Sequence, residues 1–136
     1  MSEDTKTSLV YDCVTSDGMN ESYFSTQRYD LTGTNQRMLS EQNSAVNFRL
    51  RTSDASYASG WHVANDPTLL IVLSGCIELE LRNGETKRFG KGEMFIAKDF
   101  LSKGVDFDDE KHGHKARVLG EDELQVLHLK LSKLLQ

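Results

Sequence analysis

Apolar and polar residues alternate in several short segments of this chain. Residues 45–51 read AVNFRLR and residues 77–82 read IELELR, so one parity is apolar and the other is polar or charged. Side chains at positions i and i+2 of a strand point to the same face, and a period of two therefore indicates half-buried β-strands. Residues 68–73 are apolar at both parities, which predicts a strand covered on both faces.

The remaining segments complete a chain of short elements. Further strands are expected at 9–11, 22–24, 85–89, 94–96, 116–119 and 125–131. The dipeptide Asn83-Gly84 predicts a type I′ hairpin, in which both central residues have positive φ. The polar segment 25–44 is predicted to be an irregular connection, 98–113 an acidic loop, and 132–136 a helical turn.

Many short strands, tight glycine turns, one proline and no long helical pattern are typical of an antiparallel β-sandwich or barrel. The 136 residues fit one domain with one core. We expect residues 1–8 to be a flexible N-terminus and residues 9–136 to form a single β-barrel domain.

Charge and composition limit the classes of molecule that this chain is expected to bind. The formal net charge is −5, and the nearest approach to a basic cluster is Arg49 and Arg51, which argues against nucleic acid. No apolar stretch approaches the roughly 20 residues that span a bilayer, so no membrane association is expected. The polar, acidic start is unlike a secretory signal and predicts a cytoplasmic protein. Cys13 and Cys76 are predicted to be two free thiols rather than a disulfide.

Three motifs carry a resemblance to a known family. They are WHVA at 61–64 followed by IVLSG at 71–75, RFGKGE at 88–93, and HKAR at 114–117. In this order they resemble the conserved motifs of the cupins, and in particular small single-domain, RmlC-like cupins of unassigned function. The segment SKG at 102–104 matches an element of the same subgroup equally well, which leaves the alignment of residues 98–114 open. The resemblance implies an all-β, antiparallel jelly-roll barrel whose two sheets enclose a small-molecule cavity.

The resemblance also implies where a metal would bind. In metal-binding cupins the first motif supplies two histidines and a glutamate, and the second motif supplies a third histidine, for iron, manganese, nickel or zinc. His62 stands at the first histidine position and His114 at the last. Ala64 and Thr68 stand where the second histidine and the glutamate would be. Two imidazoles without a carboxylate would make a weak metal site.

The histidines and their neighbours have structural as well as functional interpretations. His62 either lines the cavity or is a hydrogen-bonded structural histidine, and Trp61 packs beside it in both cases. His114 is the second candidate for a catalytic or metal-binding role. His128 faces the cavity if its side of the last strand turns inward, although Lys130 at the same parity favours solvent. His112, in the charged loop, is expected on the surface.

The sequence therefore leaves the question of enzymatic activity open. The first hypothesis is a small cupin whose cavity binds a small molecule, with the metal site incomplete or absent. Its expected cavity lining is Trp61, His62, Thr68, His114 and His128. The alternative is a metal-dependent enzyme of the isomerase, lyase or oxygenase type that uses His62 and His114 on a small organic substrate. A third hypothesis is a structural or interaction module. Cupin sheets often pair across subunits, so the resemblance implies a homodimer.

Overall fold

The computed structural model describes residues 7–132, which form β-strands joined by turns and loops. The strands are β1 (Ser8–Ser16), β2 (Ser22–Asp30), β3 (Thr32–Thr34), β4 (Arg37–Leu39), β5 (Ala45–Ser53), β6 (Thr68–Ser74), β7 (Cys76–Leu81), β8 (Thr86–Gly90), β9 (Met94–Lys98), β10 (His114–Val118) and β11 (Leu124–Leu131). No helix occurs in this part of the chain, and so no helix there could cross a membrane. The helical turn expected at the C-terminus and most of the N-terminal segment 1–8 fall outside the described residues, although Ser8 already belongs to β1.

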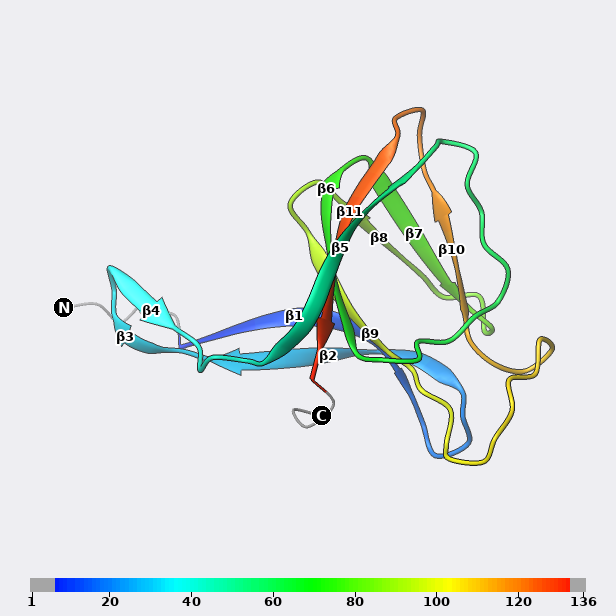
Figure 1. Ribbon diagram of the computed structural model, residues 1–136, viewed down its shortest axis with the longest axis horizontal. Coiled ribbons are helices and arrows are strands. Elements are labelled where there is room, and N and C mark those ends of the chain that lie inside the picture. The colour runs from blue at the N-terminus through cyan, green and yellow to red at the C-terminus, as the bar shows by residue number, and fades with distance from the viewer. Residues whose placement is uncertain (1–6, 133–136) are drawn as a thin grey trace.

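Two sheets face each other, as expected for an all-β jelly roll (Figure 1). The larger has six strands in the order β2-β1-β9-β6-β11-β5, and the smaller has three in the order β10-β7-β8. The larger sheet is mixed, because β1 and β9 run parallel from Asp12 beside Phe95 to Thr15 beside Lys98. The predicted all-β jelly roll is confirmed, and this one parallel pair is the departure from the expected antiparallel pairing. The departure arises because long connections bring β1 and β9 together, and no local pattern records their direction.

The core lies between the two sheets. Along each strand every second side chain points towards the other sheet, and these side chains are buried between the two sheets. The six-stranded sheet contributes Val14, Leu70, Val72, Phe95, Ala97, Leu124 and Val126, and the three-stranded sheet contributes Ile77, Leu79, Leu81, Phe89, Ala116 and Val118. The rings of Phe89 and Phe95 meet across the core with centroids 4.6 Å apart. The segment 68–73 thus forms a strand between β9 and β11, with Leu70 and Val72 buried in the core, but its other face is not fully covered as predicted, because Leu73 is 42% exposed.

The apolar side of β5 does not face this core. Val46, Phe48 and Leu50 are 60%, 63% and 67% exposed. β5 is an edge strand of the larger sheet, and these side chains point away from the core between the two sheets. Its polar parity, with Arg49 and Arg51, turns inward instead. The alternation therefore identifies the strand correctly, but the usual assumption that the apolar face is the buried face does not hold here.

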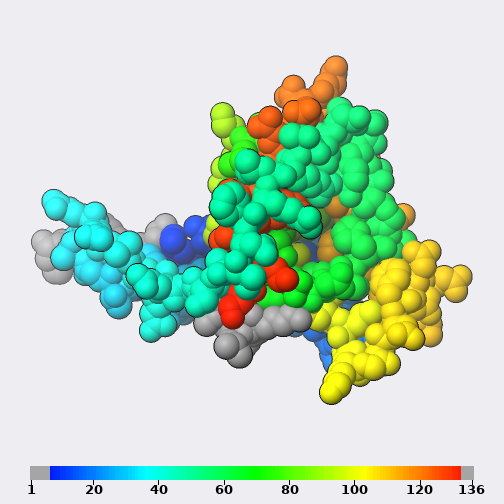
Figure 2. Space-filling model, in the orientation of Figure 1, coloured from blue at the N-terminus to red at the C-terminus, as the bar shows by residue number. Residues whose placement is uncertain are grey.

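The segment 25–44 is more regular than the sequence predicts. β2 continues to Asp30 with every residue paired to β1, and β3 and β4 then form a small hairpin of their own. This hairpin projects away from the barrel, on the side opposite the acidic loop that precedes β10 (Figures 1 and 2). The prediction of an irregular connection is wrong because polar side chains on both faces of an exposed ribbon leave no apolar periodicity to detect.

The hairpin between β7 and β8 exists, but its turn differs from the predicted type. Gly84 has φ of 92°, whereas no positive φ is found at Asn83. The amide of Gly84 donates to the carbonyl of Leu81, and the amide of Leu81 donates to the carbonyl of Glu85. This is the pattern of a type I turn followed by a left-handed glycine, and only one residue needs positive φ.

A buried carboxylate joins the strands of the smaller sheet on its outer side. Glu78 accepts hydrogen bonds from the Nε atoms of Arg88 at 3.0 Å and Arg117 at 2.8 Å. Burial would raise the pKa of Glu78, but the hydrogen bonds from Arg117 and Arg88 outweigh it and hold the pKa below its usual value. Glu78 is therefore ionised at neutral pH and fixes β10 and β8 on either side of β7.

Candidate functional site

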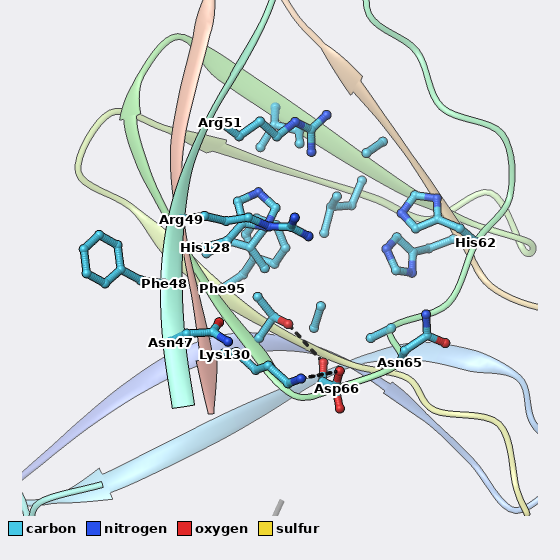
Figure 3. A pocket seen from close by; sticks show the side chains of 18 of the residues that line it. Asn47, Phe48, Arg49, Arg51, His62, Asn65, Asp66, Phe95, His128 and Lys130 are labelled. Atoms are coloured by element: carbon cyan, nitrogen blue, oxygen red, sulfur yellow. Dashed lines mark hydrogen bonds and ion pairs between the residues drawn. The ribbon is translucent and has the colours of Figure 1, made fainter. Parts of the chain in front are cut away.

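A cavity of about 580 Å³ opens between the two sheets. This volume lies in the range typical of small-molecule sites. Its floor is apolar and includes Leu70, Ile77, Leu79 and Phe95. Polar side chains reach it from β5, from β11 and from the segment that precedes β6. Figure 3 shows Arg49, Arg51 and His128 pointing into the cavity from one side, with His62 facing them from the other.

Strand pairing arranges the sheet wall of the cavity in rows. Arg49 on β5 pairs with His128 on β11, His128 pairs with Leu70 on β6, and Leu70 pairs with Phe95 on β9. Directly paired residues point to the same face, so these four side chains form one row across the sheet. The row begins with a cation at the edge strand and ends with an aromatic ring at the core. The sheet itself therefore gives the cavity a polar side and an apolar side.

His62 and His114 come together although they are far apart in the chain. Their backbones form an isolated antiparallel bridge, in which each amide donates to the other residue's carbonyl, at 3.0 Å from His62 and 2.9 Å from His114. Their imidazole rings have centroids 4.5 Å apart. Both residues line the cavity. The structure thus unites the two histidines that the sequence singles out.

Gly113 permits this close approach. Its φ is 89°, and a Cβ at this position would lie 2.3 Å from the carbonyl oxygen of His62. Any other residue would combine a strained backbone with this overlap. Gly113 therefore acts as the spacer that lets β10 start directly beside the segment containing His62.

Asp99 is the buried anchor of the histidine pair. It is fully buried just after β9, and its carboxylate accepts three hydrogen bonds. The donors are the hydroxyl of Ser22 at 2.6 Å, the amide of Ala64 at 3.0 Å and Nδ1 of His114 at 2.7 Å. A buried carboxylate requires such donors to offset its lost hydration. Asp99 thereby ties the start of β2, the His62 segment and β10 to one point.

The hydrogen bonds also orient both imidazole rings. Nδ1 of His114 donates to the Asp99 carboxylate, and Nδ1 of His62 donates to the carbonyl of Gly60 at 3.0 Å. With Nδ1 of each ring engaged in this way, Nε2 of the neutral His62 ring is free to accept a hydrogen bond. His62 is accessible at the mouth of the cavity, yet burial of its ring lowers the pKa of His62, and the neighbouring His114 lowers it further.

The other predicted site residues separate into two groups. Thr68 and His128 line the cavity, and the hydroxyl of Thr68 donates to the carbonyl of Asp66 at 3.0 Å. Trp61 is not among the lining residues, which corrects the expectation from the sequence. Its ring instead lies against the guanidinium of Arg82 at 3.8 Å and the ammonium of Lys115 at 4.8 Å. Neighbouring residues of an extended segment point to opposite sides, so His62 and Trp61 cannot both face the cavity.

His112 is buried, not solvated as expected for a charged loop. Its Nδ1 accepts a hydrogen bond from the amide of Asp108 at 2.9 Å, and its carbonyl accepts from Arg82. Arg82 also donates to the carbonyl of Asp109. The loop that precedes β10 is therefore held by its own polar groups. His112 has a structural role outside the cavity.

The donor set does not suit the metal that the resemblance implies. Among residues 7–132, no three histidine, cysteine or carboxylate side chains come together as a metal site. A catalytic zinc site, for comparison, uses three protein ligands. His62 and His114 supply two imidazole nitrogens, Ala64 supplies none, and the Thr68 hydroxyl already donates to a carbonyl. The residues present therefore do not fit a divalent metal centre.

Sequence reasoning missed two features of the site. Asp99 follows a strand without a motif, and only the fold brings it to within hydrogen-bond distance of His114. The inward direction of Arg49 and Arg51 was also missed, although the alternation of residues 45–51 already placed both on one face. Their lack of acidic neighbours on that face was a usable signal, because solvated arginines on a strand commonly alternate or pair with carboxylates.

We expect Asp99→Ala to destabilise the protein far more than Ser22→Ala. The first leaves three donors without an acceptor, of which His114 is buried and the other two are partly buried, and should lower the free energy of unfolding by about 3 kcal/mol. The second removes one donor and should cost about 1 kcal/mol. Urea unfolding followed by circular dichroism measures both. Equal losses in the two variants would show that Asp99 does not organise the site through all three bonds.

The known proteins that resemble this chain are solved structures. No model of a protein family matches this sequence, and no curated protein matches it either. Among solved structures, the cupin domain of Cnp3 from Schizosaccharomyces pombe is 11% identical with a TM-score of 0.45, over 96% of this chain and 87% of that one.

Two bacterial structures are similar over a shorter part. A cupin-2 domain protein from Shewanella frigidimarina is 16% identical with a TM-score of 0.42, over 68% of this chain and 81% of that one. Protein NMB1881 from Neisseria meningitidis is 17% identical with a TM-score of 0.41, over 68% of this chain and 84% of that one. All three TM-scores lie below 0.5, so these similarities carry no argument about fold or function, and what the barrel does is argued from its own residues.

Proposed function

We propose that this protein binds a small organic molecule in the cavity between its two sheets. The observation that carries the proposal is the cavity itself, about 580 Å³ in volume, with an apolar floor and convergent polar side chains. Apolar pockets with a few placed polar groups are the usual form of small-molecule sites. A cavity of this size with no ligand would forfeit packing contacts that a filled core would make.

The paired histidines support binding of a ligand with polar groups. Hydrogen bonds to Asp99 and to the carbonyl of Gly60 hold both rings before any ligand arrives. Such preorganisation reduces the entropy lost on binding. The lowered pKa of His62 keeps its ring neutral at neutral pH, and an accepting Nε2 there suits a hydroxyl, amide or acid proton of the ligand.

Filling the cavity tests this proposal. Ala97 lies on the cavity wall, and Ala97→Leu adds three carbons where the ligand would lie. We expect compounds that bind the unchanged protein, found by ligand-detected NMR with a library of acids, amines, alcohols, amides and sugars, to lose at least about tenfold in affinity. Ala45→Leu makes the same change at an exposed position outside the cavity and should leave binding unchanged. Binding that survives Ala97→Leu, or a library without binders, would refute the proposal.

We propose further that His62 and His114 do not hold a divalent metal ion. The proposal is supported by the donor set, because two imidazoles with no third ligand beside them among the described residues make a weak metal site. Protein purified without an affinity tag should contain far less than one iron, manganese, nickel or zinc ion per chain by elemental analysis. His62→Ala should not change that content. A stoichiometric metal that is lost in His62→Ala would instead favour the metal-dependent enzyme of the isomerase, lyase or oxygenase type.

We also propose that a second copy of this chain covers the outer side of β5. Val46, Phe48 and Leu50 expose a row of apolar side chains there, and the neighbouring β11 and β6 place Leu127, Leu129 and Leu73 on the same face. None of these six side chains is charged, although the chain as a whole has a net charge of −5. A two-fold axis would bring two identical uncharged faces together, which is the usual geometry of a homodimer.

The dimer has a direct test. Light scattering at micromolar concentration should give twice the chain mass of 15.3 kDa for the unchanged protein. Phe48→Lys places a charge in the centre of the proposed interface and should give the monomer mass with little loss of secondary structure. Val10→Lys, at another exposed apolar position on β1, is the matched control. A monomer mass for the unchanged protein would refute the proposal.

A further inference from the structure

One side of the cavity carries positive charge that the protein itself does not neutralise. Three cationic side chains line it, those of Arg49, Arg51 and Lys130, against a single carboxylate, that of Asp66. The cavity therefore has a net formal charge of +2 inside a chain whose net charge is −5. Lys130 and Asp66 form an ion pair at 3.0 Å. The surplus charge thus belongs to the two arginines.

The arginines have no acidic partner in the part of the chain that the structure describes. No ion pair joins Arg49 or Arg51 to a carboxylate among residues 7–132. Arg51 is nevertheless held in place. Its Nε donates to the hydroxyl of Ser53 at 2.9 Å, and its guanidinium lies over the ring of Tyr57 at 4.6 Å. Neither contact uses the terminal Nη groups, which remain as donors for a bound molecule.

His128 lies between these arginines and the apolar floor. Its Nε2 is the buried side-chain atom in the described part of the chain that has no hydrogen-bond partner. Burial lowers the pKa of His128, and the positive charges of Arg51 and Arg49 lower it further. Across the cavity, the pKa of His62 is lowered mainly by burial and by His114, and the charge of Arg51 makes a smaller contribution in the same direction, against an opposing one from Asp99. For His128 no carboxylate acts in the opposite direction, which agrees with an unneutralised positive potential at this end of the cavity.

The opposite part of the same wall is apolar. In the row that starts at Arg49 and His128, the next two residues are Leu70 and Phe95, which are 8% and 3% exposed. A ligand that follows this row has an anionic group at the edge strand and an apolar body over the core. Arg49 and Arg51 stand two residues apart on one face of β5, so both can approach a single planar or tetrahedral anion.

From this arrangement we infer that the ligand is a small organic acid whose carboxylate or phosphate group lies between Arg49, Arg51 and His128, with its apolar body on Leu70 and Phe95. The inference rests on the proposed small-molecule function and adds the chemical class of the ligand. It explains why β5 turns its polar face inward and its apolar face outward. A cavity for a neutral ligand would gain nothing from two unpaired guanidinium groups at its wall.

Matched acids and amides test the inference. The probes are benzoate and octanoate, their neutral counterparts benzamide and octanamide, and phenyl phosphate, each titrated into the unchanged protein and followed by NMR chemical shifts. We expect the carboxylates or phenyl phosphate to bind at least about tenfold more tightly than the amides, as charge-assisted hydrogen bonds from arginine require. The preferred anion identifies the headgroup. The advantage should shrink as salt concentration rises, whereas amide binding should not change.

Three variants locate the anion. Arg49→Met and Arg51→Met should each weaken benzoate binding by about tenfold and remove its advantage over benzamide. Arg37→Met makes the same change of charge on the exposed hairpin strand β4 and should leave benzoate affinity within about twofold. Thermal unfolding of each variant checks that the fold is kept. Equal weakening by Arg37→Met would overturn the inference, because the effect would then be one of total charge.

The outcomes separate this inference from the proposed function. If the amides bind as tightly as the acids and Ala97→Leu abolishes both, the cavity binds small molecules and the inference about anions is wrong. If the acids bind but Ala97→Leu has no effect, they bind elsewhere and both proposals fail. If neither acids nor amides bind, the inference about anions is wrong, and the proposed function then depends on whether the wider library contains a compound whose binding Ala97→Leu weakens. Preference for the acids that is lost in Arg49→Met and in Ala97→Leu supports both.

Discussion

The hydrogen bonds of Asp99 determine where the site is. This carboxylate is fully buried and receives donors from the start of β2, from the segment that carries His62 and from the first residue of β10. A buried charge is tolerated only where its donors converge, so these three segments must meet. Their meeting produces the bridge between His62 and His114, and Gly113 keeps the space for it. The mouth of the cavity is thus built around a structural carboxylate.

Strand order then distributes polarity within the cavity. The row from Arg49 through His128 and Leu70 to Phe95 crosses four strands that are dispersed along the sequence. Its cationic end lies on an edge strand, where guanidinium groups keep access to water, and its apolar end lies against the smaller sheet. A charged group loses less hydration at the edge of a sheet than at its centre, so this position lowers the free-energy cost of placing a guanidinium group in the cavity wall. The row also makes the cavity directional, with distinct places for a charged and an apolar group.

The same edge strand has consequences for both of its faces. Because β5 turns Arg49 and Arg51 inward, the period of two forces Val46, Phe48 and Leu50 outward. A strand that lines a polar cavity therefore presents an apolar exterior. The orientation of β5 therefore determines both which polar side chains line the cavity and which apolar side chains lie on the outer surface.

The sequence by itself determined the strands, because a period of two at 45–51 and 77–82 and the unbroken apolar run at 68–73 are local signals. It also selected His62, His114, Thr68 and His128, all of which line the cavity. Only the tertiary structure decided which face of β5 is buried, that Trp61 turns away and that His112 is enclosed. It alone brought Asp99 to His114, since that hydrogen bond joins the residue after β9 to the first residue of β10 and leaves no periodic pattern in the sequence. The alternation within a strand shows that its two faces differ in polarity. Which of the two faces meets the core depends on how the whole sheet packs, and that information is not in the strand's own residues.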